Sequence, residues 1–252
     1  MAAFEKAAPL YDHPEIYRRV FGDDISEEMG FLRRTLPSPP ARVLSLGCGE
    51  GRIESVLSSK GYSLHGFDAS PSMARRAVRN DPLGCYTSAR AQALPYPPSP
   101  LFDAAFSLLV SCAHITDESH WPPLLNGLHL RLKPGAPLFL ELPVCPSPTK
   151  LQGFRETTQS PGWSYTFAYA DILRPTTWGA IIHRAISIET PEGVFVDRDP
   201  YAVFTPQGIR VLIASAGFSG IRFFAPYDPS TETTTPPADV LRAIVMAQKQ
   251  TG

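Results

Sequence analysis

The fold is decided by residues 43–51, V-L-S-L-G-C-G-E-G, which join a strand to a helix. The first four residues favour a buried strand, and three glycines follow at alternate positions. A helix-compatible segment, residues 52–60, begins directly after them. A strand that turns into a helix through glycines brings bare backbone N–H groups close to a ligand. The stretch therefore predicts a binding site at the turn, and the glycine spacing limits what can bind there.

Strands and helices alternate after this turn. Ser70 followed by Pro71 is the pattern of a helix cap and a first helical residue. The rhythm of the whole segment is typical of βαβ units and predicts a parallel sheet with helices on its faces. The expected strands are residues 42–46, 62–67, 85–88, 102–110 and 137–142, and the expected helices are residues 52–60, 71–80 and 118–132.

The regions on either side of this segment have other patterns. Before it, two amphipathic helices are expected at residues 14–21 and 26–36, with Ser26 as the cap of the second. After residue 146, three consecutive extended segments are expected at residues 163–173, 178–189 and 193–204.

The C-terminal part returns to the alternating pattern. Thr205-Pro206 predicts the start of a helix that runs to Ala216. Strands are expected at residues 221–224 and 241–248. The segment between them, residues 228–237, is rich in Thr, Pro and Ser and is predicted to be a mobile loop.

Composition indicates one α/β domain of 252 residues, with 43% hydrophobic and 19% charged residues. The net charge of −1 gives no electrostatic footprint for nucleic acid or an anionic membrane. No apolar run is long enough to span a bilayer or to form a signal peptide, so we expect a cytoplasmic protein. The four cysteines form no CxxC pair, and neither a metal site nor a disulfide framework is expected.

The glycine spacing excludes two common ligands. A dinucleotide site needs G-x-G-x-x-G, but Arg52 stands where the third glycine belongs, and no G-x-x-x-x-G-K motif for a nucleoside triphosphate is present. A nucleoside-type ligand without phosphates remains. Asp68, at the end of the second strand, can accept hydrogen bonds from both ribose hydroxyls.

These features resemble the class I S-adenosylmethionine-dependent methyltransferases, in particular the small-molecule type similar to the methyltransferase 11/25 and aminosugar N-methyltransferase groups. The resemblance rests on V-L-S-L-G-C-G-E-G-R (43–52), G-F-D-A-S-P-S-M (66–73), A-L-P-Y (93–96), F-D-A-A-F-S (102–107), L-K-P-G-A-P-L-F-L-E (132–141) and a tail at 201–218. It implies a Rossmann-like, seven-stranded, mostly parallel sheet with helices on both faces, an N-terminal helical lid and an antiparallel strand insertion.

The resemblance also implies a division of the chain and a cofactor site. Residues 1–252 would form one methyltransferase domain, with a helical lid (1–40), a cofactor-binding core (41–145), a substrate-side insertion (146–204) and the C-terminal part of the core (205–252). The implied residues for S-adenosylmethionine are Gly47, Cys48, Gly49 and Gly51 along the methionine moiety, Asp68 at the ribose, Ala69 and Met73 beside the adenine, Ala91 and Gln92 at its amino edge, and Leu109 at the wall of the site.

Two positions depart from the family pattern. Ser45 stands where an acidic residue usually orients the amino group of the cofactor, and no acid lies near Arg90, where one usually faces the adenine amine. Gln92 offers an acceptor for the second role. Leaving the ligand's amine unpaired would cost about 1–3 kcal/mol at each position.

The resemblance places catalytic candidates at His114 and Tyr11. His114 follows the fourth strand, where ligands of such sheets lie, and Tyr11 with Tyr17 matches the tyrosines of an N-terminal lid. A packed histidine and tyrosines that only hold the lid are equally compatible with the sequence. The aromatic residues of the insertion form either a sheet face or the wall of an apolar substrate pocket; they are Trp163, Tyr165, Tyr169 and Trp178, with His183 beside them.

The leading hypothesis is an enzyme that transfers a methyl group from S-adenosylmethionine to an O or N atom of a small molecule, such as a secondary metabolite, and releases S-adenosylhomocysteine. A base is needed only where the acceptor must lose a proton. Two alternatives stay open: a cyclase or rearrangement enzyme on the same fold, and a non-catalytic partner subunit. We expect a monomer or homodimer with no nucleic-acid or membrane partner.

Overall fold

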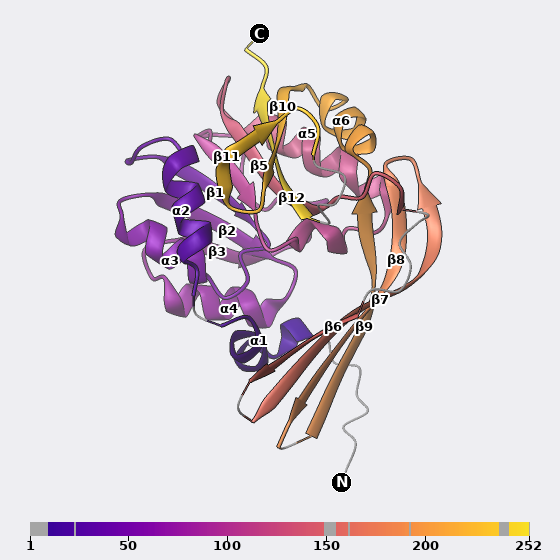
Figure 1. Ribbon diagram of the computed structural model, residues 1–252. Helices are drawn as coiled ribbons and strands as arrows, with labels where there is room; N and C mark the ends of the chain where they lie inside the picture. Colours follow the sequence, from indigo (N-terminus) through magenta and orange to yellow (C-terminus); the bar gives the residue numbers. More distant parts are fainter. Residues whose placement is uncertain are drawn as a thin grey trace.

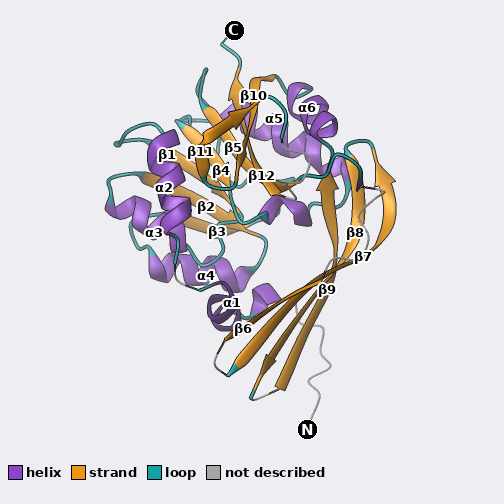
Figure 2. Cartoon of the chain, viewed as in Figure 1, coloured by secondary structure: helices purple, strands orange, loops and turns teal. Residues whose placement is uncertain are grey.

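The computed structural model describes residues 10–22, 24–148, 155–160, 162–191, 193–236 and 242–251. A large mixed sheet with helices on both faces forms the body of the molecule, and a second, antiparallel sheet extends from it (Figures 1 and 2). The predicted fold class is therefore confirmed. Among the described helices, none is both long and apolar enough to cross a membrane.

The large sheet has the strand order β11-β10-β12-β5-β4-β1-β2-β3. Its first five strands in the sequence are parallel, and the last three pair antiparallel beyond β5. The strands are β1 (Arg42–Leu46), β2 (Ser63–Asp68), β3 (Cys85–Ser88), β4 (Ala104–Ser107), β5 (Pro137–Pro143), β10 (Phe218–Ala225), β11 (Asp228–Thr233) and β12 (Arg242–Lys249).

One predicted strand and one predicted loop were wrong in extent. The strand predicted at residues 102–110 is shorter, because the chain turns away at Leu109 and Val110 with positive φ. The predicted mobile loop at 228–237 begins instead with β11, which pairs with β10 and gives the sheet eight strands rather than seven. Threonines are favoured in strands, including exposed edge strands, but the prolines of this segment led to the prediction of a loop. The end of that predicted loop, from residue 237, lies outside the described residues.

The helices follow the predictions closely. Ser70 and Thr205 cap α4 and α6 by accepting hydrogen bonds from the backbone N–H groups of Met73 (3.3 Å) and Gly208 (2.9 Å). Ser26 is not a cap, because it is the first helical residue and its N–H donates to Asp24 at 2.9 Å. The helices are α1 (Pro14–Phe21), α2 (Ser26–Thr35), α3 (Arg52–Ser59), α4 (Pro71–Asn80), α5 (Trp121–Arg131) and α6 (Pro206–Ala214), with 3₁₀ turns η1 (Leu10–Asp12), η2 (Ser111–His114) and η3 (Glu118–His120).

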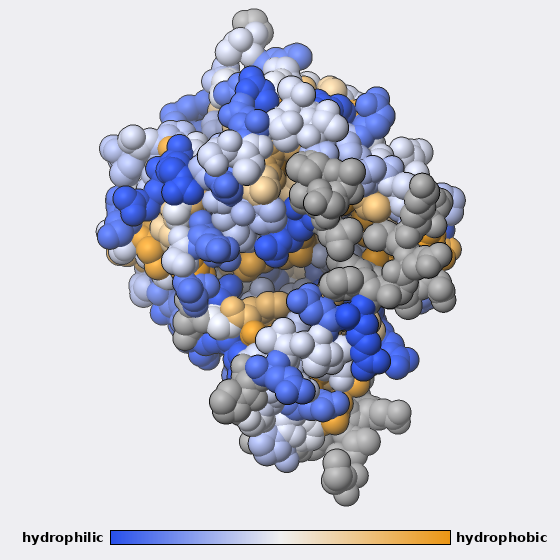
Figure 3. Space-filling model, in the orientation of Figure 1, coloured by the Kyte–Doolittle hydropathy of each residue, from blue (hydrophilic) through white to orange (hydrophobic). Residues whose placement is uncertain are grey.

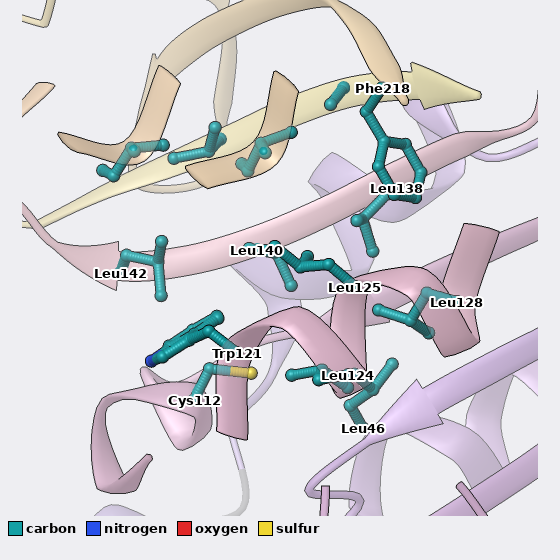
Figure 4. Packing of buried hydrophobic residues seen from close by; sticks show 14 of the residues in the cluster. Leu46, Cys112, Trp121, Leu124, Leu125, Leu128, Leu138, Leu140, Leu142 and Phe218 are labelled. Carbon is teal, nitrogen blue, oxygen red and sulfur yellow. The ribbon is translucent and has the colours of Figure 1, made fainter. Parts of the chain in front are cut away.

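Alternating residues of the parallel strands face two hydrophobic cores. On one face Val43 of β1 packs with residues of α2 and α3, and on the other Leu44 and Leu46 pack with α5 and α6. Figure 4 shows the second core, where leucines of α5 lie against leucines of β5. Each fully buried leucine contributes about 1.5–3 kcal/mol. This packing fixes the strand ends that carry the site.

The antiparallel sheet has the order β6-β7-β8-β9. Its strands are β6 (Arg155–Ser160), β7 (Trp163–Thr176), β8 (Gly179–Thr190) and β9 (Gly193–Phe204). Three of them coincide with the predicted extended segments. β6 was missed because its residues, R-E-T-T-Q-S, carry no hydrophobic alternation.

The N-terminal helix α1 packs against this sheet rather than lying free. Leu10, Ile186 and Ile188 are buried together, and Tyr17 and Val20 cover them. η1 is also tied to the body, because the Ser70 hydroxyl donates to the backbone carbonyl of Tyr11 at 2.8 Å. The segment 10–22 therefore bridges the antiparallel sheet and the edge of the large sheet (Figure 1).

Three aromatic side chains join the antiparallel sheet to the body. Phe204 at the end of β9 stacks on Trp178 with ring centroids 4.4 Å apart, and both contact Trp121 of α5. All three are buried, so this cluster fixes the insertion relative to the large sheet.

Replacing Phe204 with Ala is expected to lower the free energy of unfolding by about 3–5 kcal/mol, because it leaves a cavity between the two sheets. Urea unfolding followed by circular dichroism measures the change. Val211→Ala is the control: Val211 is 59% exposed, and its truncation is expected to stay within about 0.5 kcal/mol. Equal effects of the two substitutions would contradict this role of the aromatic cluster.

Candidate active site

The end of β2 holds the glycine turn after β1. The N–H groups of Gly47 and Cys48 donate to the Phe67 carbonyl at 2.9 and 3.1 Å, and Gly49 N–H donates to the Asp68 carboxylate at 2.9 Å. Gly47, Gly49 and Gly51 all have positive φ, at 66°, 54° and 76°. The alternating glycines of the sequence are thus the residues that this turn requires.

Two of the glycines also permit close packing. A Cβ on Gly47 would lie 2.6 Å from the Cβ of Ser111, and a Cβ on Gly51 would lie 3.0 Å from the Cα of Ala77. Gly51 therefore brings α3 against α4, whereas Gly47 lets the η2 turn approach the glycine turn.

A small cavity of about 40 Å³, here called the glycine-loop cavity, lies over this turn. Gly47, Cys48, Gly49 and Leu109, all predicted cofactor residues, line it. Gly51 does not line this cavity; it is the N-cap of α3 and lies at the end of the turn.

A second cavity of about 150 Å³, here called the Gln92 cavity, lies beside the first. Ala69, Ala91, Gln92 and His114, four of the predicted site residues, line it. Gly47 and Ser111 line both cavities, so the two are adjacent.

Two other predicted residues lie outside both cavities. The Asp68 carboxylate is occupied by backbone donors, with Gly49 N–H on one oxygen and Ser70 N–H on the other at 2.8 Å. Each oxygen keeps a further lone pair for a ligand. Met73 is fully buried in the first turn of α4. Their contacts with a cofactor stay predictions.

A third cavity of about 260 Å³, here called the aromatic cavity, separates the body from the antiparallel sheet. Figure 3 shows hydrophobic residues along this recess. Tyr17 and Leu109 line both the aromatic and the glycine-loop cavities. The other residues that line it are Tyr11, Phe21, Val110, Pro143, Glu156, Tyr165, Phe167, Arg184, Tyr201 and Arg242.

The aromatic residues of the insertion therefore divide into two groups. Tyr165 lines the aromatic cavity, whereas Trp178 is buried in the core and joins the two sheets. Trp163 is half-buried and His183 is exposed on β8. The side chain of Tyr169 lies outside the described part of the structure.

A strained turn lies where the aromatic and glycine-loop cavities meet. Leu109 and Val110 both have positive φ, at 52° and 51°, which costs of order 1–3 kcal/mol for each such residue. The buried carboxylate of Glu141 accepts a hydrogen bond from Leu109 N–H at 2.6 Å and another from the Tyr227 hydroxyl at 2.7 Å. Arg242 pairs with its other oxygen at 3.0 Å. Glu141 thus holds Leu109 at the junction.

His114 and Tyr11 are brought together by a chain of polar contacts. The Tyr11 hydroxyl lies 2.8 Å from His114 Nε2, and His114 Nδ1 lies 2.9 Å from the Asp199 carboxylate. Arg184 donates to both oxygens of Asp199, at 2.7 and 2.8 Å, and approaches the Tyr11 hydroxyl at 3.5 Å. Lid, body and insertion each contribute to this chain.

The charges fix the direction of these hydrogen bonds. Burial opposes ionisation of Asp199, but the hydrogen bond from His114 and the charge of Arg184 outweigh it and hold the pKa of Asp199 below its usual value. An ionised Asp199 accepts from Nδ1–H, so neutral His114 has its free lone pair on Nε2, facing the Tyr11 hydroxyl. Burial raises the pKa of Tyr11, so this hydroxyl keeps its proton at neutral pH.

The sequence analysis missed Asp199, Arg184 and Glu54. Asp197 and Asp199 alternate on one face of β9, and this pair of acids, with Arg198 between them in a strand of mostly apolar residues, was the available signal. Glu54 was missed because it lies inside α3, where a glutamate looks like an ordinary helical residue.

Ser45, the position without the expected acid, contacts a carboxylate after all. Its hydroxyl donates to Glu54 Oε1 at 2.5 Å, and both residues line the glycine-loop cavity. Burial raises the pKa of Glu54 to about 7, and the Ser45 hydrogen bond acts in the opposite direction. In the described part of the chain, no three or more His, Cys, Asp or Glu side chains gather closely enough to hold a metal ion.

The chain is similar in sequence and in fold to known methyltransferases. The family described as "Methyltransferase domain" matches residues 43–135. Malonyl-[acyl-carrier protein] O-methyltransferase of Pseudescherichia vulneris is 31% identical over 134 residues, 53% of this chain and 49% of that protein. The chain spans about half the length of the first curated relatives it matches.

Two solved structures share the fold at low identity. An S-adenosylmethionine-dependent methyltransferase from Clostridium acetobutylicum superposes with a TM-score of 0.72 at 15% identity, over 94% of this chain and 97% of that chain. CalS10, an amino pentose methyltransferase from Micromonospora echinaspora, superposes with a TM-score of 0.68 at 16% identity, over 99% of this chain and 100% of that chain. Residues 43–135 thus match a methyltransferase domain family, and the fold of the whole chain is similar to that of solved S-adenosylmethionine-dependent methyltransferases.

Proposed function

We propose that this chain transfers a methyl group from S-adenosylmethionine to an O or N atom of a small molecule. The observation that carries the proposal is the meeting of the three cavities: the glycine-loop cavity adjoins the Gln92 cavity at Gly47 and Ser111, and the aromatic cavity at Tyr17 and Leu109. A ligand with an amino acid part and a nucleoside part could occupy the glycine-loop and Gln92 cavities together. Its methyl group would then face an acceptor molecule in the aromatic cavity.

The residues present fit this cofactor. The glycine-loop cavity contains the buried carboxylate of Glu54, which suits an ammonium group. Ala91 and Gln92 line the neighbouring cavity, and the side-chain oxygen of Gln92 can accept a hydrogen bond from an adenine amine. Asp68 has lone pairs left for ribose hydroxyls. S-adenosylmethionine supplies a methyl group on a sulfonium, which an acceptor atom attacks in line.

The aromatic cavity would hold the acceptor, and Tyr11 would face it. Tyr11 lines this cavity, whereas His114 lies behind it, 2.8 Å from the Tyr11 hydroxyl. As an acceptor hydroxyl or ammonium loses its proton, Tyr11 would take that proton and pass its own to His114 Nε2. Asp199 would stabilise the imidazolium that forms.

The acceptor would be a small molecule with a flat or apolar part, because Tyr17, Phe21, Tyr165 and Phe167 line the cavity. A relative named as an O-methyltransferase supports oxygen as the acceptor atom, and the structurally similar CalS10 is named as an amino pentose methyltransferase, whose named substrate carries both O and N atoms. We propose that lid, core, insertion and C-terminal part work as one unit, since the Tyr11–His114–Asp199 chain spans three of them.

Asp68→Ala is expected to weaken S-adenosylmethionine binding by about tenfold or more, because it removes the charged acceptor for the ribose. Isothermal titration calorimetry measures the affinity. Asp103→Ala is the control, because this acid pairs with Lys133 away from all three cavities. Absence of binding by the wild-type protein would contradict the proposed function itself.

Tyr11→Phe is expected to lower kcat by about 10²-fold or more, because it breaks the path for the proton while keeping the ring. Release of S-adenosylhomocysteine, screened over hydroxyl, carboxyl and amine acceptors, gives the assay, and mass spectrometry shows the added methyl. The affinity for S-adenosylmethionine is expected to stay unchanged. His183→Asn, an exposed histidine on β8, is the control. A Tyr11→Phe variant with wild-type kcat would exclude this path.

A further inference from the structure

Glu54 is a buried carboxylate that opens onto the glycine-loop cavity. It is 2% exposed, lies in the first turn of α3 and lines the cavity together with Ser45, Gly47 and Gly49. Among the described side chains, the Ser45 hydroxyl donates a hydrogen bond to its Oε1 at 2.5 Å. A hydroxyl is neutral, so this contact orients the carboxylate without neutralising it.

Two other buried glutamates near the site are paired with arginines within the chain. Glu50 pairs with Arg18 at 3.1 Å and lies 3.7 Å from Arg76, and Glu141 pairs with Arg242. Glu54 forms no ion pair with any arginine or lysine of the described residues. An ionised carboxylate in this position is costly without a positive partner.

The surroundings of Glu54 make a cation more favourable still. Burial raises its pKa to about 7, and the charges of Asp68 and Asp81 act in the same direction. Cys48 and Tyr86 also face it, and both are neutral because burial raises their pKa values. Glu50 and Arg52 also line the cavity, but Glu50 pairs with Arg18, and Arg52 donates to the carbonyls of Phe21 and Gly22. A compact positive group in this small cavity would therefore be the ion partner that Glu54 lacks among the described residues.

We propose that Glu54, oriented by Ser45, binds the α-ammonium group of the S-adenosylmethionine amino acid moiety. The proposal rests on the proposed function and assigns to α3 the carboxylate that Ser45 does not supply. Glu54 is then a binding residue and takes no part in the proton path of Tyr11 and His114.

The test compares two thioether ligands that differ in the amino acid part. S-adenosylhomocysteine carries the ammonium, whereas 5′-methylthioadenosine lacks the whole amino acid. In calorimetry, Glu54→Gln is expected to lower the affinity for S-adenosylhomocysteine by about tenfold or more. The affinity for 5′-methylthioadenosine is expected to stay within about twofold of the wild-type value. Ser45→Asp in the Glu54→Gln background is expected to recover part of the affinity. Glu27→Gln, an exposed acid on α2, is the control.

The wild-type protein provides a second readout. Ammonium binding needs ionised Glu54, whose pKa is about 7. The affinity for S-adenosylhomocysteine should therefore rise about tenfold between roughly pH 6 and pH 8, with proton release on binding, and should be flat in Glu54→Gln.

Thermal unfolding checks that the variant folds. A raised pKa means that the folded protein loses stability as pH rises from the ordinary glutamate value of 4.5 towards about 7. Glu54→Gln should therefore melt above the wild type at about pH 8.

The outcomes separate this inference from the proposed function. Equal S-adenosylhomocysteine affinity in wild type and Glu54→Gln, or an equal loss for both ligands, overturns the role of Glu54 and leaves the proposed function standing. No binding of either ligand by the wild type overturns both.

Discussion

The whole site depends on the hydrogen bonds that join the glycine turn to the end of β2. The Phe67 carbonyl accepts from Gly47 and Cys48, and the next residue, Asp68, accepts from Gly49. These bonds hold Gly47 and Gly49, which both have positive φ, in a fixed path, so the turn and the space above it are formed before any ligand arrives. Without the bonds from β2, neither the glycine-loop cavity nor the start of α3, which carries Glu54, would be fixed.

The lid depends on this same turn. Arg18 of α1 pairs with Glu50 of the turn, and Arg52 donates to the carbonyls of Phe21 and Gly22 at the end of α1. Tyr11 then reaches His114, whose other nitrogen contacts Asp199 of the insertion. Residues 10–22 thus line one side of the aromatic cavity and are held there by contacts with the glycine turn, and Tyr17 and Leu109 lie where this cavity meets the glycine-loop cavity.

Local patterns in the sequence predicted the parallel core, the caps at Ser70 and Thr205, and the glycine turn, because each depends on residues close together in the chain. The Asp199–His114 contact joins residues on β9 and η2, and no local pattern encodes it. β6 and β11 were missed because polar edge strands lack hydrophobic alternation. The sequence shows that position 45 lacks an acid. That Glu54 lies beside Ser45 follows only from the packing of α3 against β1, which the sequence pattern does not give.

The central claim is that one ligand occupies the glycine-loop and Gln92 cavities and presents its sulfur to the aromatic cavity. A crystal structure with S-adenosylhomocysteine tests it most directly. The account predicts the adenine beside Gln92, the ammonium at Glu54 and the sulfur at Leu109, facing Tyr11. Binding of the ligand elsewhere, or with its sulfur turned away from the aromatic cavity, would contradict it.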